Sequence, residues 1–216
     1  MKYIKLFENF EEFDPYELMM IPPYKKAEML IWEISRSSRS KTINIDLVNA
    51  LIAMGADLSW EGEYGGTPLY SAVSNSKKEI VQTLLEAGAD PNQKSKGRFS
   101  PLISACDKYR PNLEIIKLLF EYGADPNVQD YDGSTPLHIA VRNDNSEITE
   151  LLLTNGADPN IQDNIGNTPL HTYANYIIKN LLIKHGADET IKNDQGKTWD
   201  EMTDDDFIDW EDFDEE

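Results

Sequence analysis

Residues that commonly perform chemistry are sparse in this chain, which has one cysteine and three histidines among 216 residues. A catalytic cysteine needs a neighbouring base and a lowered pKa. Cys106 follows Ala105 at a place where a small apolar residue would face a core, so we interpret it as a buried structural thiol. His138 could act as a base, but its T-P-L-H motif recurs at His171, which favours a structural role for both.

Metal and cofactor sites find equally little support. Packed helices lie about 10 Å apart, so His138 and His171 in successive repeated segments cannot both lie about 2 Å from one zinc ion. The acidic turn at 130–133 resembles a calcium loop but lacks its glutamate at the twelfth position. Neither G-x-x-x-x-G-K nor G-x-S-x-G occurs. We therefore predict no enzyme activity, no metal and no cofactor.

These histidines and acidic residues lie in segments such as 123–140, which reads G-A-D-P-N-V-Q-D-Y-D-G-S-T-P-L-H-I-A. Gly123 suits the left-handed position after a helix C-terminus. Pro126 interrupts helix, and Asp132-Gly133 can form the tip of a turn. Thr135 can cap a second helix, whose first turn accommodates the proline that follows. The segment therefore predicts a helix end, a projecting turn and a new helix start.

Variants of this segment recur along the chain. The G-A-D sequence repeats at intervals of 33, 35, 33 and 30 residues, and the proline of S/T-P-L repeats at 33, 35 and 33. Between them, runs such as E-I-T-E-L-L-L from Glu147 have apolar residues at i, i+3 and i+4. The pattern predicts five helix pairs, at about 24–54, 67–87, 100–122, 135–155 and 168–185. Since one short pair cannot bury its apolar face alone, stacked pairs must share a core.

This pattern resembles the ankyrin repeat, with T-P-L-H opening the inner helix, paired leucines in the outer helix and G-A-D-x-N closing each repeat. The resemblance covers about 45–201 and implies an all-α solenoid of about five stacked helix–turn–helix repeats with projecting turns. In that family the T-P-L-H histidine hydrogen-bonds within its turn. Three residues fewer near Asn175 and Tyr176 should shorten a loop or a helix end in the last full repeat.

The resemblance predicts an ankyrin-repeat domain over 23–202 with flanking segments on both sides. Repeats are expected at about 23–57, 58–90, 91–125, 126–158 and 159–188, followed by a partial C-terminal cap at 189–202, where Trp199 replaces the proline. Residues 1–22 form an N-terminal extension that we expect to contain a short helix. Its aromatic stripe would pack over the end of the core or dock into a partner.

Residues 203–216 form an acidic tail interspersed with large apolar residues, including Phe207, Trp210 and Phe213. Three interpretations stay open. The tail could be a solubilising cap whose aromatic side chains lie against the last repeat. It could be a linear motif, with these three residues as anchors, that enters a basic groove of a partner. It could also fold back over the repeats as a mask, or imitate nucleic acid.

The net charge of −19 and the isoelectric point near 4.4 argue against direct nucleic-acid binding and against anionic membrane surfaces. They favour a protein partner with a basic surface. No secretory signal or membrane-spanning apolar run is visible, and the single cysteine rules out an internal disulfide. We therefore expect a soluble, cytoplasmic monomer.

The resemblance places partner binding on the turn tips and the concave face of the inner helices. Carried onto this chain, the candidate residues are Tyr64, Lys94, Lys96, Arg98, Phe99, Tyr131, Asp132, Arg142 and Ile165. Aromatic residues and arginine are common anchors of protein interfaces. In the alternative interpretation the aromatic residues only buttress neighbouring turns. Within 123–140, we interpret Gln129, Tyr131, Asp132 and Ser134 as partner contacts rather than scaffold.

Two classes of function follow. The first is a non-catalytic protein–protein interaction module that acts as an adaptor or inhibitor. The second is an acidic decoy or nucleic-acid mimic that acts through the tail. The start M-K-Y-I-K-L-F-E-N-F resembles small proteins of tailed phages, which suggests a phage or viral product directed at a host defence protein.

Overall fold

The structure is a computed structural model that describes residues 19–36, 43–62, 65–95, 99–107, 111–172 and 175–203. The chain divides into two compact units. Unit 1 comprises Met1–Ala105 and Asn112–Ala124, and unit 2 comprises Cys106–Pro111 and Asp125–Glu216. No helix within the described ranges is long and apolar enough to cross a membrane.

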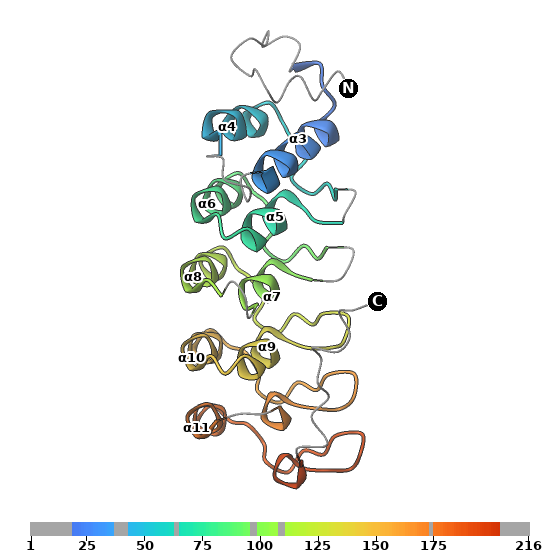
Figure 1. The fold of residues 1–216 in the computed structure, drawn as a ribbon, viewed down its shortest axis with the longest axis vertical. Helices are drawn as coiled ribbons and strands as arrows, with labels where there is room; N and C mark the ends of the chain where they lie inside the picture. The colour runs from blue at the N-terminus through green and yellow to red at the C-terminus, as the bar shows by residue number, and fades with distance from the viewer. Residues whose placement is uncertain are drawn as a thin grey trace. The chain divides into compact units, whose positions relative to one another are not determined.

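Unit 1 has two layers of helices. The helices are, in order, α3 (Pro23–Arg36), α4 (Ile45–Ala53), α5 (Pro68–Ser74), α6 (Lys78–Glu86), α7 (Pro101–Ala105) and α8 (Leu113–Glu121). The inner helices α3, α5 and α7 contact one another in sequence, and the outer helices α4, α6 and α8 do the same (Figure 1). Each inner helix also packs against the outer helix that follows it.

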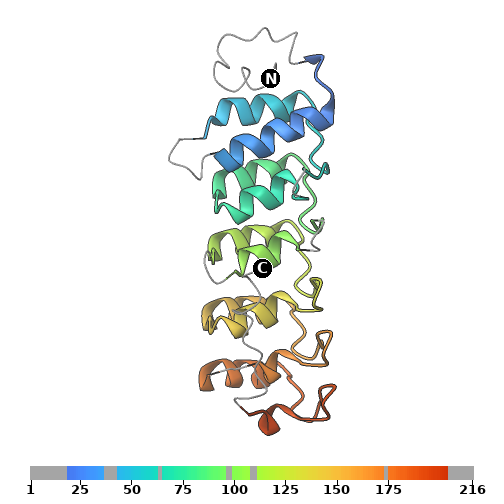
Figure 2. The ribbon, with the colours of Figure 1, turned by 45° about the vertical axis from the view of Figure 1, so that its right-hand side comes forward.

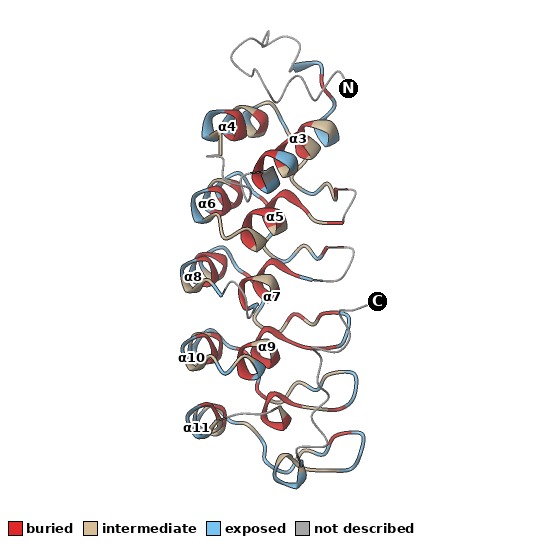
Figure 3. Cartoon of the chain, viewed as in Figure 1, coloured by how far each residue is buried: buried red, intermediate tan, exposed pale blue. Residues whose placement is uncertain are grey.

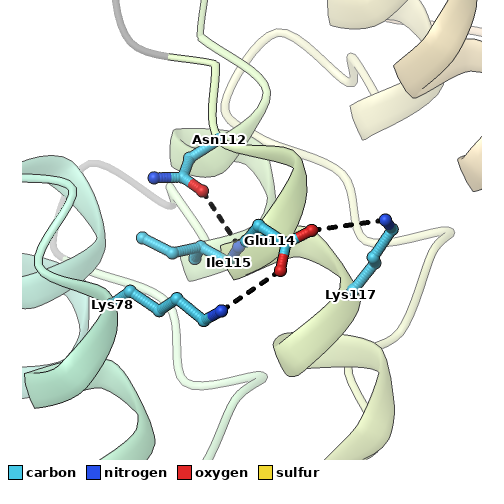
Figure 4. A network of polar contacts seen from close by, with 5 residues as sticks. All are labelled: Lys78, Asn112, Glu114, Ile115 and Lys117. Carbon is cyan, nitrogen blue, oxygen red and sulfur yellow. Dashed lines mark hydrogen bonds and ion pairs between the residues drawn. The ribbon is translucent and has the colours of Figure 1, made fainter.

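Exposed ion pairs join two outer helices of unit 1. Lys78 of α6 donates to Glu114 of α8 at 3.1 Å, and Lys117 donates to the same carboxylate at 3.3 Å (Figure 4). Hydrogen bonds from Lys78 and then Lys117 lower the pKa of Glu114. Because all three side chains are largely exposed, these pairs contribute little to stability. They do fix the direction of the Glu114 side chain, which is the second residue of outer helix α8.

Unit 2 repeats the two-layer arrangement, but its last two inner elements are single 3₁₀ turns. It contains α9 (Pro136–Arg142), α10 (Ser146–Thr154), the 3₁₀ helix η3 (Pro169–His171), α11 (Tyr176–Lys184) and the 3₁₀ helix η4 (Trp199–Glu201). Inner elements α9, η3 and η4 contact in that order, and outer helices α10 and α11 pack together (Figure 2). Thr135 caps α9 by accepting from the backbone of His138, as expected for the T-P-L-H motif.

The apolar faces of paired helices meet in the core of each unit (Figure 3). In unit 1, Leu69 of α5 and Leu84 of α6 are buried, and in unit 2, Leu137 of α9 and Leu152 of α10 are buried. Leu84 and Leu152 belong to the apolar pattern of the outer helices, and Leu69 and Leu137 belong to the T-P-L motif that opens the inner helices. Their burial is the main stabilising term of the fold, at roughly 1.5–3 kcal/mol for each large side chain.

The asparagine of G-A-D-x-N links successive repeats, which explains why it recurs. In unit 2, the Asn127 side chain donates to Gly156 O at 3.2 Å and accepts from Asp158 N at 2.8 Å. Asn160 makes the same pair of bonds with Gly186 O and Asp188 N. One amide therefore satisfies backbone groups at the end of the next outer helix.

The predicted all-α architecture of repeated helix pairs is confirmed, and within the described residues the helices pair at the five predicted places. The shortened connection has the expected effect. Tyr176 begins α11 only seven residues after Pro169, whereas Ser146 begins α10 ten residues after Pro136, and the inner helix η3 is reduced to one 3₁₀ turn. Most of the N-terminal extension and nearly all of the tail lie outside the described residues, and the repeat boundaries stay predictions.

Candidate functional site

Two turn tips of unit 2, at 130–134 and 163–167, are each shaped from within by one carboxylate, and the tip at 193–197 is shaped by the side-chain amide oxygen of Asn193. The Asp130 side chain accepts from the backbone N–H of Asp132 at 3.0 Å and of Ser134 at 2.8 Å. Asp163 accepts equivalently from Ile165 and Asn167 in the next tip. Burial raises the pKa of both carboxyl groups, while the hydrogen bonds act in the opposite direction. Each of these two tips is therefore held in one conformation by its own acid, which is buried at Asp130 and half-buried at Asp163.

Neighbouring tips in unit 2 are also joined to one another. Asn164 donates its backbone N–H to Asp132 O and its side-chain amide to Tyr131 O, both at 2.9 Å. Asp194 N donates to Ile165 O at 3.1 Å. Gln129 donates to Gln162 O at 3.1 Å. The backbone of the candidate contact residues is thus fixed by the adjacent tip.

Side chains on this fixed backbone point outward. Tyr131 is 72% exposed and Ile165 is 42% exposed, and Asp132 is exposed beside Tyr131. Arg142, exposed at the end of α9, acts electrostatically on the buried Asp130 and on His138. An exposed aromatic ring on an ordered backbone is a suitable anchor for a protein interface, because little conformational entropy is lost when it is covered.

Because neighbouring tips are in close contact, alanine substitutions of two glycines should differ in their effect on stability. A Cβ on Gly166, whose φ is +78°, would lie 2.6 Å from Asp194 N, whereas a Cβ on Gly156, whose φ is +88°, meets nothing within 4 Å. Gly156→Ala should cost only the left-handed strain, about 1–2 kcal/mol. Gly166→Ala should cost clearly more because the tips must separate. Equal losses in chemical denaturation would show that the tips are not in contact.

The two T-P-L-H histidines hydrogen-bond within their turns, as expected. His138 Nδ1 accepts from Thr135 N at 3.1 Å, and its Nε2 lies 3.0 Å from Asn167 O in the next turn. His171 does the same with Thr168 N and Lys197 O. Because both ring nitrogens are engaged, each imidazole acts as a bridge between turns. Within the described ranges, no cluster of His, Cys, Asp or Glu could hold a metal ion.

Acid should weaken unit 2 through His138. Burial lowers its pKa from 6.5 to about 4, so the unfolded chain takes up a proton that the folded chain excludes between these values. Stability is complete above about pH 6.5 and falls as the pH drops to about 4, by about 3 kcal/mol. An NMR titration of the His138 ring should give a pKa below 5. Titration near 6.5 would contradict the buried bridge.

Cys106 is buried, and burial raises the pKa of its thiol. A protonated, inaccessible sulfur cannot act as a nucleophile at neutral pH. The structure therefore agrees with the interpretation of Cys106 as a structural residue.

The predicted contact residues fall into three groups. Tyr131, Asp132, Arg142 and Ile165 belong to unit 2 and form its exposed tips and inner-helix end. Lys94 and Phe99 belong to one turn of unit 1, where Phe99, 43% exposed, accepts from Ser95 N at 2.9 Å. The remaining candidates lie outside the described residues: Tyr64, Lys96, Arg98, Phe207, Trp210 and Phe213.

Two interpretations made from the sequence are wrong. Ser134 is buried, because its backbone N–H turns inward to Asp130, and so it is not available to a partner. Gln129 donates to Gly133 O and Gln162 O, so its side chain belongs to the scaffold. The sequence does indicate the scaffold role of Gln129, because V-Q-D at 128–130 recurs as I-Q-D at 161–163.

Comparison with known proteins gives matches along most of the chain. A family model described as ankyrin repeats in three copies matches residues 36–95 and 102–194. Human 2-5A-dependent ribonuclease is 43% identical over 63 residues, which are 29% of this chain and 8% of that protein. An ankyrin repeat protein of fowlpox virus (strain NVSL) is 43% identical over 61 residues, 27% of this chain and 12% of that protein. The matches thus span only a small part of either relative.

Proposed function

The chain belongs to the ankyrin repeat family, and from this premise we propose that it binds a protein partner through its turn tips and inner helices, as an adaptor or inhibitor. Repeats of this family generally mediate protein–protein interaction without catalysis. The repeat fold by itself does not identify the partner, because recognition depends on side chains outside the scaffold.

The observation that supports this function most is the separation of scaffold from surface in unit 2. Asp130 accepts from the backbone of Asp132, and Asn164 donates to the backbone carbonyl of Tyr131, so the tip backbone is fixed. The side-chain ring of Tyr131 is nevertheless 72% exposed. A ring that only buttressed a neighbouring turn would be covered. Ile165 and Arg142 supply apolar area and a cation within the same unit. Together with Asp132, this surface suits a partner with an apolar pocket and mixed charge around it.

An affinity pull-down with three baits tests the proposal. The wild-type chain and Tyr176→Ala, which removes an exposed tyrosine from outer helix α11, should capture the same partner from a lysate of the native host. Tyr131→Ala should capture much less of it. If all three baits capture the partner equally, the tips of unit 2 are not the binding surface.

The acidic decoy remains the rival proposal, with a partner that normally binds nucleic acid. Residues 203–216 contain nine acidic and no basic residues. A decoy bound through this charge should lose affinity steeply as salt rises. An adaptor bound through Tyr131 should show a shallow salt dependence and keep its affinity when residues 204–216 are deleted. We propose the adaptor or inhibitor function. Affinity that falls steeply with salt, and that is lost when residues 204–216 are deleted, would instead support the decoy.

The similarity to a fowlpox virus ankyrin repeat protein is compatible with a viral origin and a host target. Identification of the captured protein by mass spectrometry tests that suggestion directly. Capture of a defence protein from host cells, lost with Tyr131→Ala, would support it, and capture of a partner encoded beside the gene itself would not.

A further inference from the structure

The last outer helix, α11, departs from the outer helices before it. In α6, α8 and α10 the second residue is a glutamate, at Glu79, Glu114 and Glu147, but in α11 it is Ile177. Figure 4 shows how α8 uses this position, with Glu114 held between two lysines. In α11 the first two residues, Tyr176 and Ile177, are 79% and 61% exposed. Two adjacent exposed large side chains, with Ile177 in place of a glutamate, favour a surface that another segment covers.

One side of α11 is also less buried than the same side of α10. Thr149 and Leu153 of α10 are buried, and α10 packs against α11. The equivalent residues of α11, Lys179 and Ile183, are only half-buried, although Lys179 Nζ lies 3.6 Å from the centre of the Trp199 ring of η4. With Tyr176 they form a stripe at i, i+3 and i+7. We call Tyr176, Lys179 and Ile183 the open face of α11.

Charge sets α11 apart as well. Among the described outer helices, α10 carries two glutamates and no lysine, and α6 and α8 each carry two glutamates and one lysine. Helix α11 carries Lys179 and Lys184 and no acidic residue. In a chain of net charge −19, a cationic outer helix is complementary to an acidic segment.

The chain supplies such a segment at the right distance. An outer helix begins ten residues after Pro136 and seven after Pro169, so an outer helix following Trp199 would begin between 206 and 209. Residues 204–216 cover that range. A helix from there to residue 216 would be about 12–16 Å long, which is comparable to the nine residues of α11, about 14 Å. Phe207, Trp210 and Phe213, three apart, would share one face.

We propose that residues 204–216 dock on the open face of α11 as a short amphipathic helix in the place of a sixth outer helix. Phe207, Trp210 and Phe213 cover Tyr176 and Ile183, and the acidic residues of the segment pair with Lys184, since the Lys179 ammonium already lies over the Trp199 ring. The inference does not depend on the proposed function, since no tip residue takes part.

Paramagnetic broadening tests where the segment lies. A nitroxide on Asp214→Cys, in a Cys106→Ala background, should broaden the backbone amides of α11 more than those of α9 or of the tips at Tyr131 and Ile165. Broadening centred on the tips would show a mask over the binding surface, and absence of broadening would show no docking. Broadening that appears only when labelled chain is mixed with unlabelled, isotope-enriched chain would show docking on a second copy. Each of these three results overturns the proposal.

Hydrogen exchange on the full-length chain gives a second readout. Replacing Phe207, Trp210 and Phe213 together by serine should speed amide exchange in α11 by about tenfold or more, because the helix loses its cover. Ile208→Ser, in the same segment but off the shared face, should leave the rates within about twofold. Equal rates in the wild type and the triple variant would contradict docking.

Discussion

His138→Ala should destabilise unit 2 by about 2–5 kcal/mol in equilibrium unfolding by urea. The substitution leaves the N–H of Thr135 and the carbonyl of Asn167 without the imidazole that joins them. His138 is 1% exposed, so water cannot replace these bonds without opening the turn. Each buried polar group left unpaired costs about 1–3 kcal/mol, and the loss of packing adds to that.

A matched substitution separates the effect of losing the His138 bridge between turns from the effect of losing a histidine elsewhere in the chain. His185 caps the end of α11 and is only half-buried, so His185→Ala should change the free energy of unfolding by less than about 1 kcal/mol. If His138→Ala were as mild as His185→Ala, the imidazole would not join the turns. The chain offers an internal parallel, because in η4 the same position is Glu201, whose carboxylate accepts from Thr198 N at 2.9 Å.

Tyr131→Ala should weaken partner binding by about 30-fold or more while leaving the fold intact. An interface residue that acts as a hot spot contributes about 2 kcal/mol or more when truncated to alanine. The ring is 72% exposed, and the bonds that fix Tyr131 use its backbone carbonyl, which alanine retains. The affinity measured by titration calorimetry should therefore fall while the melting temperature changes little.

The double variant Phe99→Ala/Tyr131→Ala decides between contact and buttress for both aromatic residues. Unchanged melting with lost binding supports their role as contacts, whereas lost folding shows that they buttress the turns. Tyr176→Ala is the control, because it removes a tyrosine ring from outer helix α11 rather than from a turn tip. Its affinity should stay within about twofold of the wild type.

The repeated architecture could be predicted from the sequence because its signals are local. Thr135 and Pro136 determine a helix start, and Gly156 a helix end, through backbone geometry that neighbouring repeats do not alter. The three missing residues before α11 predicted a shortened element for the same reason. The spacing of leucines then left one way to bury the apolar faces.

Contacts between repeats could be predicted only in part. Gln129 and Asn164 are ordinary surface residue types, and their scaffold role depends on backbone carbonyls about 33 residues away in sequence. Ser134 was misassigned because its side chain resembles a turn-tip residue, while its position beside the Asp130 carboxylate buries it. Whether Tyr131 packs or protrudes depends on how neighbouring tips are spaced, and spacing is not encoded in one repeat.

The partner should bind to the tips of unit 2, and an NMR titration tests this binding most directly. Isotope-enriched chain is titrated with the partner captured by the wild-type bait. The largest shifts are expected at the amides of Tyr131, Asp132 and Ile165 and at Arg142 at the end of α9. Largest shifts in α10 and α11, with these four resonances unmoved, would contradict it.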